Sequence, residues 1–356
     1  MPTSGRPGFA RASVGTDRSM HGSSENRRVR VLHSPVNIAG GPGAISQGLR
    51  ELGVESTLLV FNERPFERGF DLNLRLRDTS RKSSIPFNLP RQLRAFLWAA
   101  PRFDVFHFHA GLTLLPRRLN LPALRVLRKG IVFQSWGSDL RGRHASDVRY
   151  LKAAGAVIVG SYLTRRLAPR GPWPEYDVVP PALVLTDWQP APTEPGEILR
   201  VAHAPSKRAV KGTDAVLAAV ESLQKRGVPI ELDLIEGVPN REARLRYAQA
   251  DVVIDQLRIG WYGMLAIEAM ALAKPVVVQL DEQAAAETEE AFGLELPLVR
   301  ASEQNLEDVL AGLVEVRESL PELGRRSREY VEHVHAHTNV ARQVLEIYER
   351  VMPISS

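Results

Sequence analysis

The feature of this chain that most constrains its fold is a regular alternation of short, apolar, β-rich runs with helical patterns. In the first half, six such runs are separated by helical segments, which is typical of a parallel, doubly wound α/β sheet. A helix with Ile45, Leu49 and Leu52 on one face is predicted between the first two runs. The six runs are VRVLHSPV (29–36), STLLVF (56–61), FDVFHFHA (103–110), GIVFQSWG (130–137), AVIVGS (156–161) and YDVVPP (176–181).

A Pro-dense segment, 178–197, interrupts the alternation and has the stiffness and polarity of an interdomain linker. The pattern then restarts with the run ILRVAHA (198–204) and an amphipathic helix. Three further runs follow, PIELDLI (229–235), ADVVIDQL (250–257) and KPVVVQL (274–280). The sequence therefore predicts two Rossmann-like α/β domains that face one another across a cleft.

The predicted domain boundaries follow from these patterns. The first domain spans 29–182, the linker 183–197 and the second domain 198–335. Residues 1–28 are rich in Gly, Ser and Arg and lack the apolar stretch of a signal peptide. We expect them to form a disordered tail, within which Met20 is an alternative start.

Composition excludes several classes of protein. The chain has no Cys, so disulfide frameworks, thiolate nucleophiles and Cys-ligated zinc are excluded. Apolar residues make up 44% and charged residues 24% of the 356, the profile of a soluble globular protein. No run of about 18 uncharged apolar residues occurs, so no spanning helix is predicted. A cytoplasmic location is expected.

The net charge of +5 conceals a difference between the two halves. Residues 1–180 contain 28 Lys and Arg against 13 Asp and Glu, whereas residues 181–356 contain 18 against 28. The first half is thus +15 and the second −10. A basic half favours a polyanionic or membrane-surface partner, and the alternative is a solvated, Arg-rich surface.

Loops that follow strands are where open α/β sheets bind ligands, and two of these loops suit an anion. The first, AGGPG (39–43), contains Gly41 and Gly43, which would let backbone amides approach a phosphate before a helix N-terminus. It is not the G-x-G-x-x-G of a dinucleotide site. The second, HAPSKRAVKGT (203–213), places Lys207, Arg208 and Lys211 beside the next helix, which suits a diphosphate, or else is an exposed basic loop.

Two histidine patterns raise the question of a metal. In HFHAG (107–111), His107 and His109 are expected on opposite faces of their strand, so the pair is not expected to bind one metal. One would be a core residue and the other would reach the cleft. The segment HVHAHT (333–338) offers three His at a spacing of two, and we interpret it as a surface loop in preference to a metal clip.

The stretch GWYGMLAIEAMALAKPVVV (260–278) indicates a turn, a short helix and a buried strand. Glu268 lies within that helix among apolar neighbours, where an unpaired charge is costly. A carboxylate that faces a cleft can accept two hydrogen bonds from the hydroxyls of a ribose. The alternative is a Glu paired with a core Arg or Lys. Because the flanking residues are small and apolar, we favour the binding role.

These loops, in this order, resemble those of the retaining GT-B glycosyltransferases of the family 4 (group 1) type, which use nucleotide-sugar donors. The likeness runs from about residue 29 to 350. The signature of that family resembles E-G-F-G-L-x-x-L-E-A-M-A-x-G-x-P-V-V, and this chain has GWYGMLAIEAMALAKPVV across it. VVPPALVLTDWQP is similar to the family's linker, and TNVARQVLEIYERV, within 336–356, to its last helix, which crosses back to the first domain. The residues on the signature are Gly263, Glu268, Ala269, Met270, Ala271, Pro275, Val276 and Val277.

The resemblance implies a role for several residues. It places Glu268 on the donor ribose, Lys211 on the donor diphosphate and His109 on the transferred sugar. Gly41 and Gly43 correspond to the first-domain loop that approaches the phosphates. The remaining residues expected to bind the donor are Ser206, Lys207, Arg208, Tyr262, Gly263 and Met264.

Two positions depart from the family pattern. Gly260 stands where the family has a first Glu, which helps to hold the donor sugar, and Asp255 or Gln256 are the possible substitutes. Ser206 stands where the family has an Arg in the diphosphate loop, and Lys207 or Arg208 would supply that charge.

Together these observations predict an enzyme that transfers a hexose, with retention, from a nucleoside diphosphate sugar to a glycan, lipid-linked or small-molecule acceptor. No cofactor and no metal site are expected, and the reaction is expected to be independent of metal ions. The basic first domain would bind the acceptor, with segment 85–103 as an apolar and basic patch at an anionic membrane surface. The alternative is a non-catalytic GT-B-like module that binds a glycan or a partner protein. Nucleic acid is not expected, because no interleaved aromatic and basic platform occurs.

Overall fold

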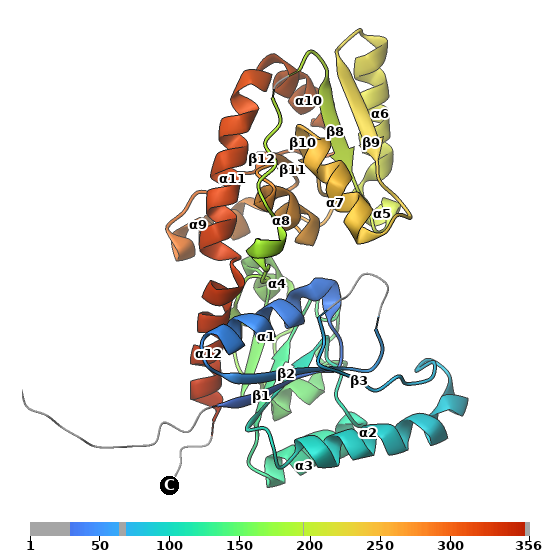
Figure 1. Ribbon diagram of the computed structural model, residues 1–356, viewed down its shortest axis with the longest axis vertical. Helices are drawn as coiled ribbons and strands as arrows, with labels where there is room; N and C mark the ends of the chain where they lie inside the picture. The colour runs from blue at the N-terminus through green and yellow to red at the C-terminus, as the bar shows by residue number, and fades with distance from the viewer. Residues whose placement is uncertain (1–28, 64–68, 195, 353–356) are drawn as a thin grey trace, which may run out of the picture.

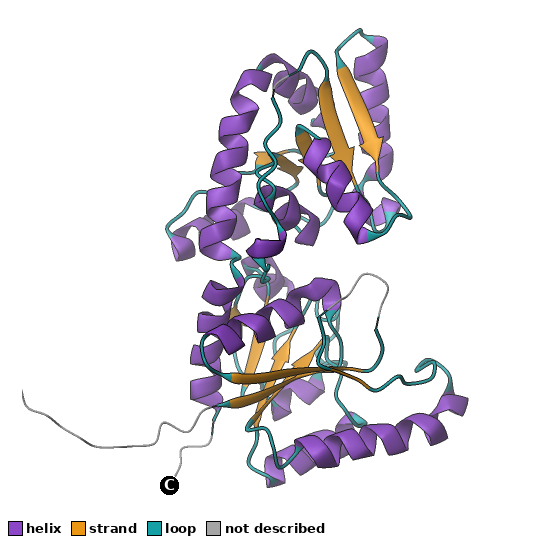
Figure 2. Ribbon diagram, in the orientation of Figure 1, coloured by secondary structure: helices purple, strands orange, loops and turns teal. Residues whose placement is uncertain are grey.

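The computed structural model describes residues 29–63, 69–194 and 196–352, so the expected tail lies outside the described residues. Figure 1 shows two α/β units stacked along the long axis of the molecule, each with its own sheet. Helices flank both sheets (Figure 2). No helix among the described residues is long and apolar enough to cross a membrane.

The first sheet has seven parallel strands in the order β3-β2-β1-β4-β5-β6-β7. The order reverses between β1 and β4, which makes this pair the switch point of a doubly wound sheet. This confirms the fold predicted from the alternating pattern, although β3 was not predicted. The strands are β1 (Arg30–Ser34), β2 (Glu55–Val60), β3 (Leu72–Asn73), β4 (Val105–His109), β5 (Gly130–Gln134), β6 (Ala156–Val159) and β7 (Tyr176–Val178).

Helices cover both faces of the first sheet. The predicted face of the first helix is confirmed, because Ile45 and Leu49 are fully buried. The second helix covers most of the predicted apolar and basic segment 85–103. Like the third helix, it lies at the end of the first unit that is remote from the second unit (Figure 1). The helices are α1 (Gly41–Glu51), α2 (Ile85–Ala99), α3 (Arg117–Val126) and α4 (Tyr162–Leu167), with short 3-10 turns at Ile38–Gly40, Lys82–Ser84 and Arg149–Ala153.

The second sheet has five parallel strands in the order β12-β11-β10-β8-β9. Its switch point lies between β8 and β10. The four strands β8–β11 fall within the predicted runs, whereas β12 was missed. The five strands of this sheet are β8 (Leu199–His203), β9 (Ile230–Leu234), β10 (Val252–Ile254), β11 (Val276–Val278) and β12 (Val299–Arg300). The helices are α5 (Arg208–Lys211), α6 (Thr213–Lys225), α7 (Asn240–Gln249), α8 (Met264–Ala271), α9 (Glu282–Phe292), α10 (Leu306–Glu315) and α11 (Leu320–Val334), with 3-10 turns at Leu185–Asp187 and Arg317–Ser319.

The last helix, α12 (His337–Val351), returns to the first unit and packs against α1. Its buried residues Val340, Val344 and Tyr348 share one apolar cluster with Val31 of β1 and Ile45 of α1. The helix therefore completes the core of a sheet whose first strand lies about 300 residues earlier in the chain.

The close approach of α1 and α12 depends on Gly48, and this gives a stability prediction. A Cβ atom at Gly48 would lie 2.4 Å from the carbonyl oxygen of His337 and 2.8 Å from Cβ of Ala341. The two helices would have to separate, so Gly48→Ala should lower the free energy of unfolding by about 1–3 kcal/mol. Urea denaturation measures this change.

Gly312 of α10 offers a matched control, because a Cβ atom there would meet nothing within 4 Å. Gly312→Ala should raise the free energy of unfolding by roughly 0.5–1 kcal/mol, as expected for replacing Gly inside a helix. Equal effects of the two substitutions would contradict the close packing of α1 on α12.

Candidate functional site

The candidate site lies at the switch point of the second sheet. Lys211 ends α5, which follows β8, and Asp255 directly follows β10. Gly263 is the N-cap of α8. Because the carboxyl ends of neighbouring parallel strands meet at one edge of the sheet, segments distant in sequence converge here. Figure 1 shows α5 and α8 at the end of the second unit that is directed toward the first.

Asp255 connects the other two residues. Its side chain is fully buried; Oδ1 lies 2.5 Å from Nζ of Lys211, and Oδ2 accepts a hydrogen bond of 2.6 Å from the backbone N–H of Gly263. The side chain of Lys211 is only 14% exposed. The ammonium group is therefore held in one place beside the start of α8, and a Cβ atom at Gly263 would lie 3.6 Å from Lys211 Nζ.

Glu268 lies on α8, and its carboxylate makes no hydrogen bond or ion pair with the residues that the structure describes. Partial burial raises the pKa of Glu268 to about 7, the charge of Arg244 opposes this rise and that of Asp255 adds to it. The side chain is partly exposed, while its neighbours Ile267 and Ala269 are fully buried. The core ion pair considered as the alternative role of Glu268 is thus not formed.

Arg244 is engaged elsewhere. It lies over the ring of Trp188, with 3.8 Å from its Cζ to the ring centroid, and it donates to the carbonyl of Asp187. Glu268 consequently keeps open acceptor atoms in partly desolvated surroundings. Such a carboxylate is suited to accept hydrogen bonds from hydroxyl groups of a ligand.

In the basic loop after β8, some cationic side chains are paired with a carboxylate and others are not. Arg208 forms an ion pair with Glu236, which follows β9, so its guanidinium is already neutralised. Ser206 and Lys207 are exposed, and the ammonium group of Lys207 makes no hydrogen bond or ion pair with any described residue. Lys207 is therefore the cation of this loop whose side chain has no partner among the described residues, whereas Lys211 is paired with Asp255 and Arg208 with Glu236.

Gly260, which stands where the family has its first Glu, and the two possible substitutes for that Glu all make hydrogen bonds or ion pairs within the protein. Gly260 has a φ of 81°, in the left-handed region that favours glycine, and its carbonyl accepts a hydrogen bond of 2.8 Å from the N–H of Asp281. Oε1 of Gln256 accepts a hydrogen bond of 2.9 Å from the N–H of Ile259. Since Asp255 is bound to Lys211, both expected substitutes already have partners within the protein.

Tyr262 and Met264, which were expected to bind the donor, make contacts within the protein. The hydroxyl of Tyr262 is buried, 3.1 Å from Nε2 of His335 and 3.4 Å from the hydroxyl of Tyr330. Met264 packs against the apolar cluster beneath α8. The side chain of Tyr262 thus connects the start of α8 to α11. Binding of a donor by Tyr262 stays a prediction, and its buried hydroxyl does not support it.

The first-domain glycines have packing roles. A Cβ atom at Gly41 would lie 2.1 Å from the indole ring of Trp136, so the ring rests on this backbone. The N–H of Gly43 donates to Oδ1 of Asn37 at 3.0 Å. A phosphate at Gly41 would have to displace Trp136, whose buried Nε1 has no partner in the described part of the chain.

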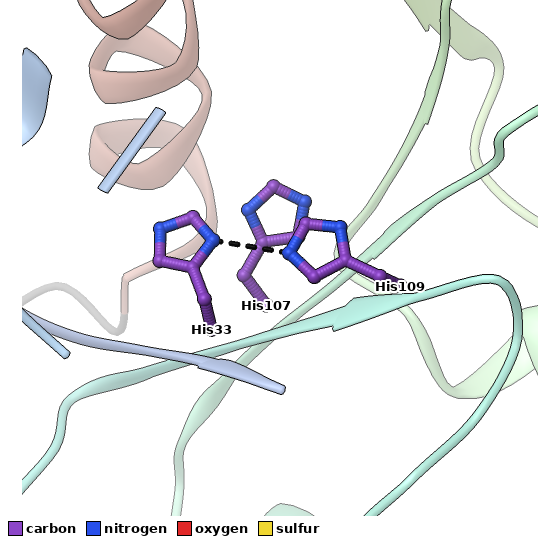
Figure 3. A group of neighbouring side chains, drawn as sticks. All are labelled: His33, His107 and His109. Atoms are coloured by element: carbon purple, nitrogen blue, oxygen red, sulfur yellow. Dashed lines mark hydrogen bonds between the residues drawn. The ribbon is translucent and has the colours of Figure 1, made fainter. Parts of the chain in front are cut away.

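The expectation that His107 and His109 point to opposite faces was wrong. Side chains alternate along a strand, so residues two apart share a face. Their ring centroids are 4.5 Å apart, and His33, the register partner of His107 on β1, joins them (Figure 3). His109 is fully buried, and its Nε2 lies 3.1 Å from Nδ1 of His33. The structure therefore gives no support for contact between His109 and a sugar.

The interpretation of 333–338 as a surface loop was also wrong. His333 lies in the last turn of α11 and is exposed, but His335 and His337 are buried where α11 meets α12. Nδ1 of His335 contacts the carbonyl of Pro181 at 2.8 Å, and Nε2 of His337 contacts the carboxylate of Glu51 at 3.0 Å. These histidines join elements that are distant in sequence instead of forming a metal clip.

Sequence reasoning missed three residues that shape these sites. Trp136 follows β5, Glu236 follows β9, and His33 lies near the carboxyl end of β1. The signal that could have found His33 and Glu236 is their position on or after strands adjacent to the ones considered. Nothing in the local sequence indicated that Trp136 would cover Gly41.

Comparison with known proteins was made by sequence and by structure. No protein-family model and no curated protein matches this sequence. Among solved structures, sucrose-phosphate synthase from Thermosynechococcus elongatus is similar at a TM-score of 0.62 and 15% identity, over 91% of this chain and 99% of that one. Anabaena HepE in complex with UDP and glucose has a TM-score of 0.59 and 12% identity, over 91% and 100%.

A further similar structure is UDP-GlcNAc 2-epimerase from Neisseria meningitidis bound to UDP-GlcNAc, with a TM-score of 0.54 and 12% identity, over 91% of this chain and 100% of that chain. These likenesses extend over nearly the whole described chain and over both sheets. With its two parallel, doubly wound sheets, the chain has the GT-B fold.

Proposed function

We propose that this protein is a glycosyltransferase that transfers a hexose, with retention, from a nucleoside diphosphate sugar. The observation that carries the proposal is the ion pair of Lys211 with Asp255 beside Gly263, the N-cap of α8, which is the helix that carries the unpaired carboxylate of Glu268. The resemblance of 260–278 to the GT-B signature and the GT-B fold support it.

In this proposal each residue acts through its charge or hydrogen bonds. Glu268 accepts hydrogen bonds from the ribose hydroxyls, and Lys211 stabilises the diphosphate as the bond to the sugar breaks. Asp255 positions Lys211 by a short ion pair, and it also fixes the backbone of Gly263. No metal ion takes part in the departure of the diphosphate, because a cation and backbone amides supply the stabilisation.

Because Asp255 compensates the charge of Lys211, the net charge of the pair is zero, and the diphosphate needs a second cation. Lys207 is exposed on the same loop and fits this role. Arg208 would fit it only if its pair with Glu236 opened. His109 has no part in this mechanism, because its ring is buried.

A donor screen tests the proposal. Nucleoside diphosphate sugars are added singly, and the melting temperature is measured, since a ligand that binds the native state raises it. The donors that stabilise the protein are then incubated without acceptor, and released nucleoside diphosphate and sugar are identified by mass spectrometry and NMR.

The possible outcomes separate the proposal from its rivals. Slow donor hydrolysis with an unchanged sugar supports a transferase. Binding without hydrolysis, with or without added acceptors, favours a non-catalytic GT-B-like module. A released sugar with inverted configuration at C2 favours an epimerase, and the absence of any stabilising donor contradicts the proposal.

We place the acceptor on the first domain, at the inner face of a membrane. In α2, an outward stripe at four-residue spacing is 36–62% exposed and consists of Ile85, Leu89, Leu93 and Leu97. In α3, Val126 is 82% exposed. Asp104 is the only acidic residue between 79 and 138, so every charged residue of α2 and α3 is basic. Helices of this kind bind anionic lipid surfaces.

Replacing Arg91 and Arg94 of α2 with Glu should release the protein from such a surface. Each basic charge removed near an anionic membrane costs about 1 kcal/mol, so the affinity for vesicles containing anionic lipid should fall by roughly 30-fold or more. Co-sedimentation at low salt measures the bound fraction, and binding should weaken as salt shortens the Debye length from about 30 Å at 0.01 M to about 10 Å at 0.1 M.

Arg342→Glu, on the exposed surface of α12, is the matched control and should leave sedimentation nearly unchanged. Hydrolysis of the donor in solution should survive the double change, because α2 lies far from the second unit (Figure 1). A wild-type protein that ignores anionic vesicles at low salt would indicate a soluble acceptor.

A further inference from the structure

The three histidines at the switch point of the first sheet form a group that the proposed function does not use. His33 comes from β1, and His107 and His109 come from β4, which pairs with β1 in parallel. All three rings are fully buried between the sheet and α12 (Figure 3). One ring nitrogen from each lies within 4.8 Å of the other two.

Hydrogen bonds within the protein do not satisfy this group. The six ring nitrogens make three contacts: between His33 and His109, between His107 and Tyr348, and between His33 and Tyr348. Nε2 of His107 and Nδ1 of His109 are left buried without a partner in the described structure. Buried polar atoms almost always have a partner, so the orphaned Nε2 of His107 points to a missing ligand. Nδ1 of His109 cannot bind the same ion as Nε2 of its own ring, which faces His33.

The separations suit a small metal ion. Two nitrogens bound to Zn²⁺ at about 2.0–2.1 Å with tetrahedral angles lie roughly 3.4 Å apart. Nδ1 of His33 and Nε2 of His109 face each other at 3.1 Å. The longest separation, 4.8 Å, exceeds that spacing, so an imidazole ring must rotate before all three nitrogens reach one ion.

Tyr348 supplies the outer contacts that metal-binding histidines usually have. Its hydroxyl lies 2.6 Å from Nδ1 of His107 and 3.3 Å from Nε2 of His33. These contacts fix one nitrogen of His107 and one of His33 and leave the other nitrogen of each of these two rings for a ligand, as hydrogen bonds to ligating histidines do.

We propose that His33, His107 and His109 bind one Zn²⁺ ion or a similar divalent transition metal, which stabilises the first domain. Three imidazoles and no carboxylate suit Zn²⁺, Cu²⁺ or Ni²⁺, and they do not suit Mg²⁺ or Ca²⁺, which prefer oxygen. Because the site is fully buried, the ion enters as the chain folds. The role is structural, and it is independent of donor binding in the second domain.

Metal content tests the assignment directly. Protein without a histidine tag, expressed with added zinc and passed through a chelating column, should retain close to one zinc per chain by elemental analysis. His109→Asn should retain almost none. His335→Gln removes another fully buried, hydrogen-bonded histidine and should retain as much zinc as the wild type.

A second experiment refolds the wild-type protein, so that its result does not depend on whether the His109→Asn variant folds. Protein unfolded in guanidinium with a chelator is refolded with Zn²⁺, with Mg²⁺ or with no metal. Only Zn²⁺ should raise the melting temperature, and Co²⁺ should give the intense visible bands of a tetrahedral nitrogen-ligated site. An unchanged melting temperature and no such bands would overturn the proposal, as would zinc retained equally by His109→Asn. Neither readout uses donor turnover, so the result is separate from that of the proposed function.

Discussion

Replacing Lys211 with alanine should lower the turnover number by about 100- to 1,000-fold, the loss expected when one group that stabilises a developing negative charge is removed. The charge of Lys211 matters most as the diphosphate departs, so the effect should appear in kcat more than in the KM for a neutral acceptor. Steady-state kinetics with the donor found by the screen measures both.

This substitution also leaves Asp255 buried without its partner, so part of the loss could arise from a distorted site. The double change of Lys211→Met and Asp255→Asn removes both charges and should restore much of the stability without restoring turnover. Lys207→Ala, on the exposed part of the same loop, should reduce turnover less. If the double variant regained activity along with stability, Lys211 would be only a structural partner of Asp255.

Replacing Glu268 with glutamine should weaken donor binding by about 1.5–3 kcal/mol, or roughly 10- to 150-fold, because a hydrogen bond to a charged group is lost. Calorimetry measures this affinity. In the wild type, affinity should also fall as the pH drops below the pKa of about 7, because the protonated carboxyl is a poorer acceptor. The glutamine variant should show a nearly flat pH dependence.

The stability of the same variant should change in the opposite direction. The pKa of Glu268 is higher in the folded than in the unfolded chain, so the folded state binds more protons, and stability falls as the pH rises from about 4.5 to about 7. Glu268→Gln removes this penalty and should stabilise the protein at pH 8 by about 1–2 kcal/mol, given the partial exposure of the carboxylate. A variant that is less stable at pH 8 would indicate that Glu268 holds the core together.

Much of the fold could be predicted because buried parallel strands leave a strong local signal. Runs such as 130–137 and 156–161 are almost wholly apolar, and the strands β5 and β6 lie within them. The two missed strands, β3 and β12, have only two residues each, and their partly exposed side chains carry no such signal. Edge strands of this length are defined by pairing with a neighbour, which sequence alone does not reveal.

The candidate site could be predicted only in part. Glu268 and Lys211 were predicted because they lie in segments that follow strands and match family motifs, and the structure brings Lys211 beside Gly263. The partner of each charge could not be predicted, because pairs such as Arg208 with Glu236 depend on which strands are neighbours. The burial of His109 was not predicted, because His107 and His109 were assigned to opposite faces of β4, whereas residues two apart on a strand share one face.

The return of α12 to the first unit has a consequence for how the chain folds during synthesis. A ribosome releases β1, α1 and β4 long before it reaches residue 340, yet Val340, Val344 and Tyr348 complete the apolar layer over these elements. The apolar residues of the first half that α12 covers therefore stay exposed until α12 has left the ribosomal exit tunnel. Transiently exposed apolar surface of this kind is prone to aggregation, so a nascent chain arrested before residue 337 should need chaperones more than the finished protein does.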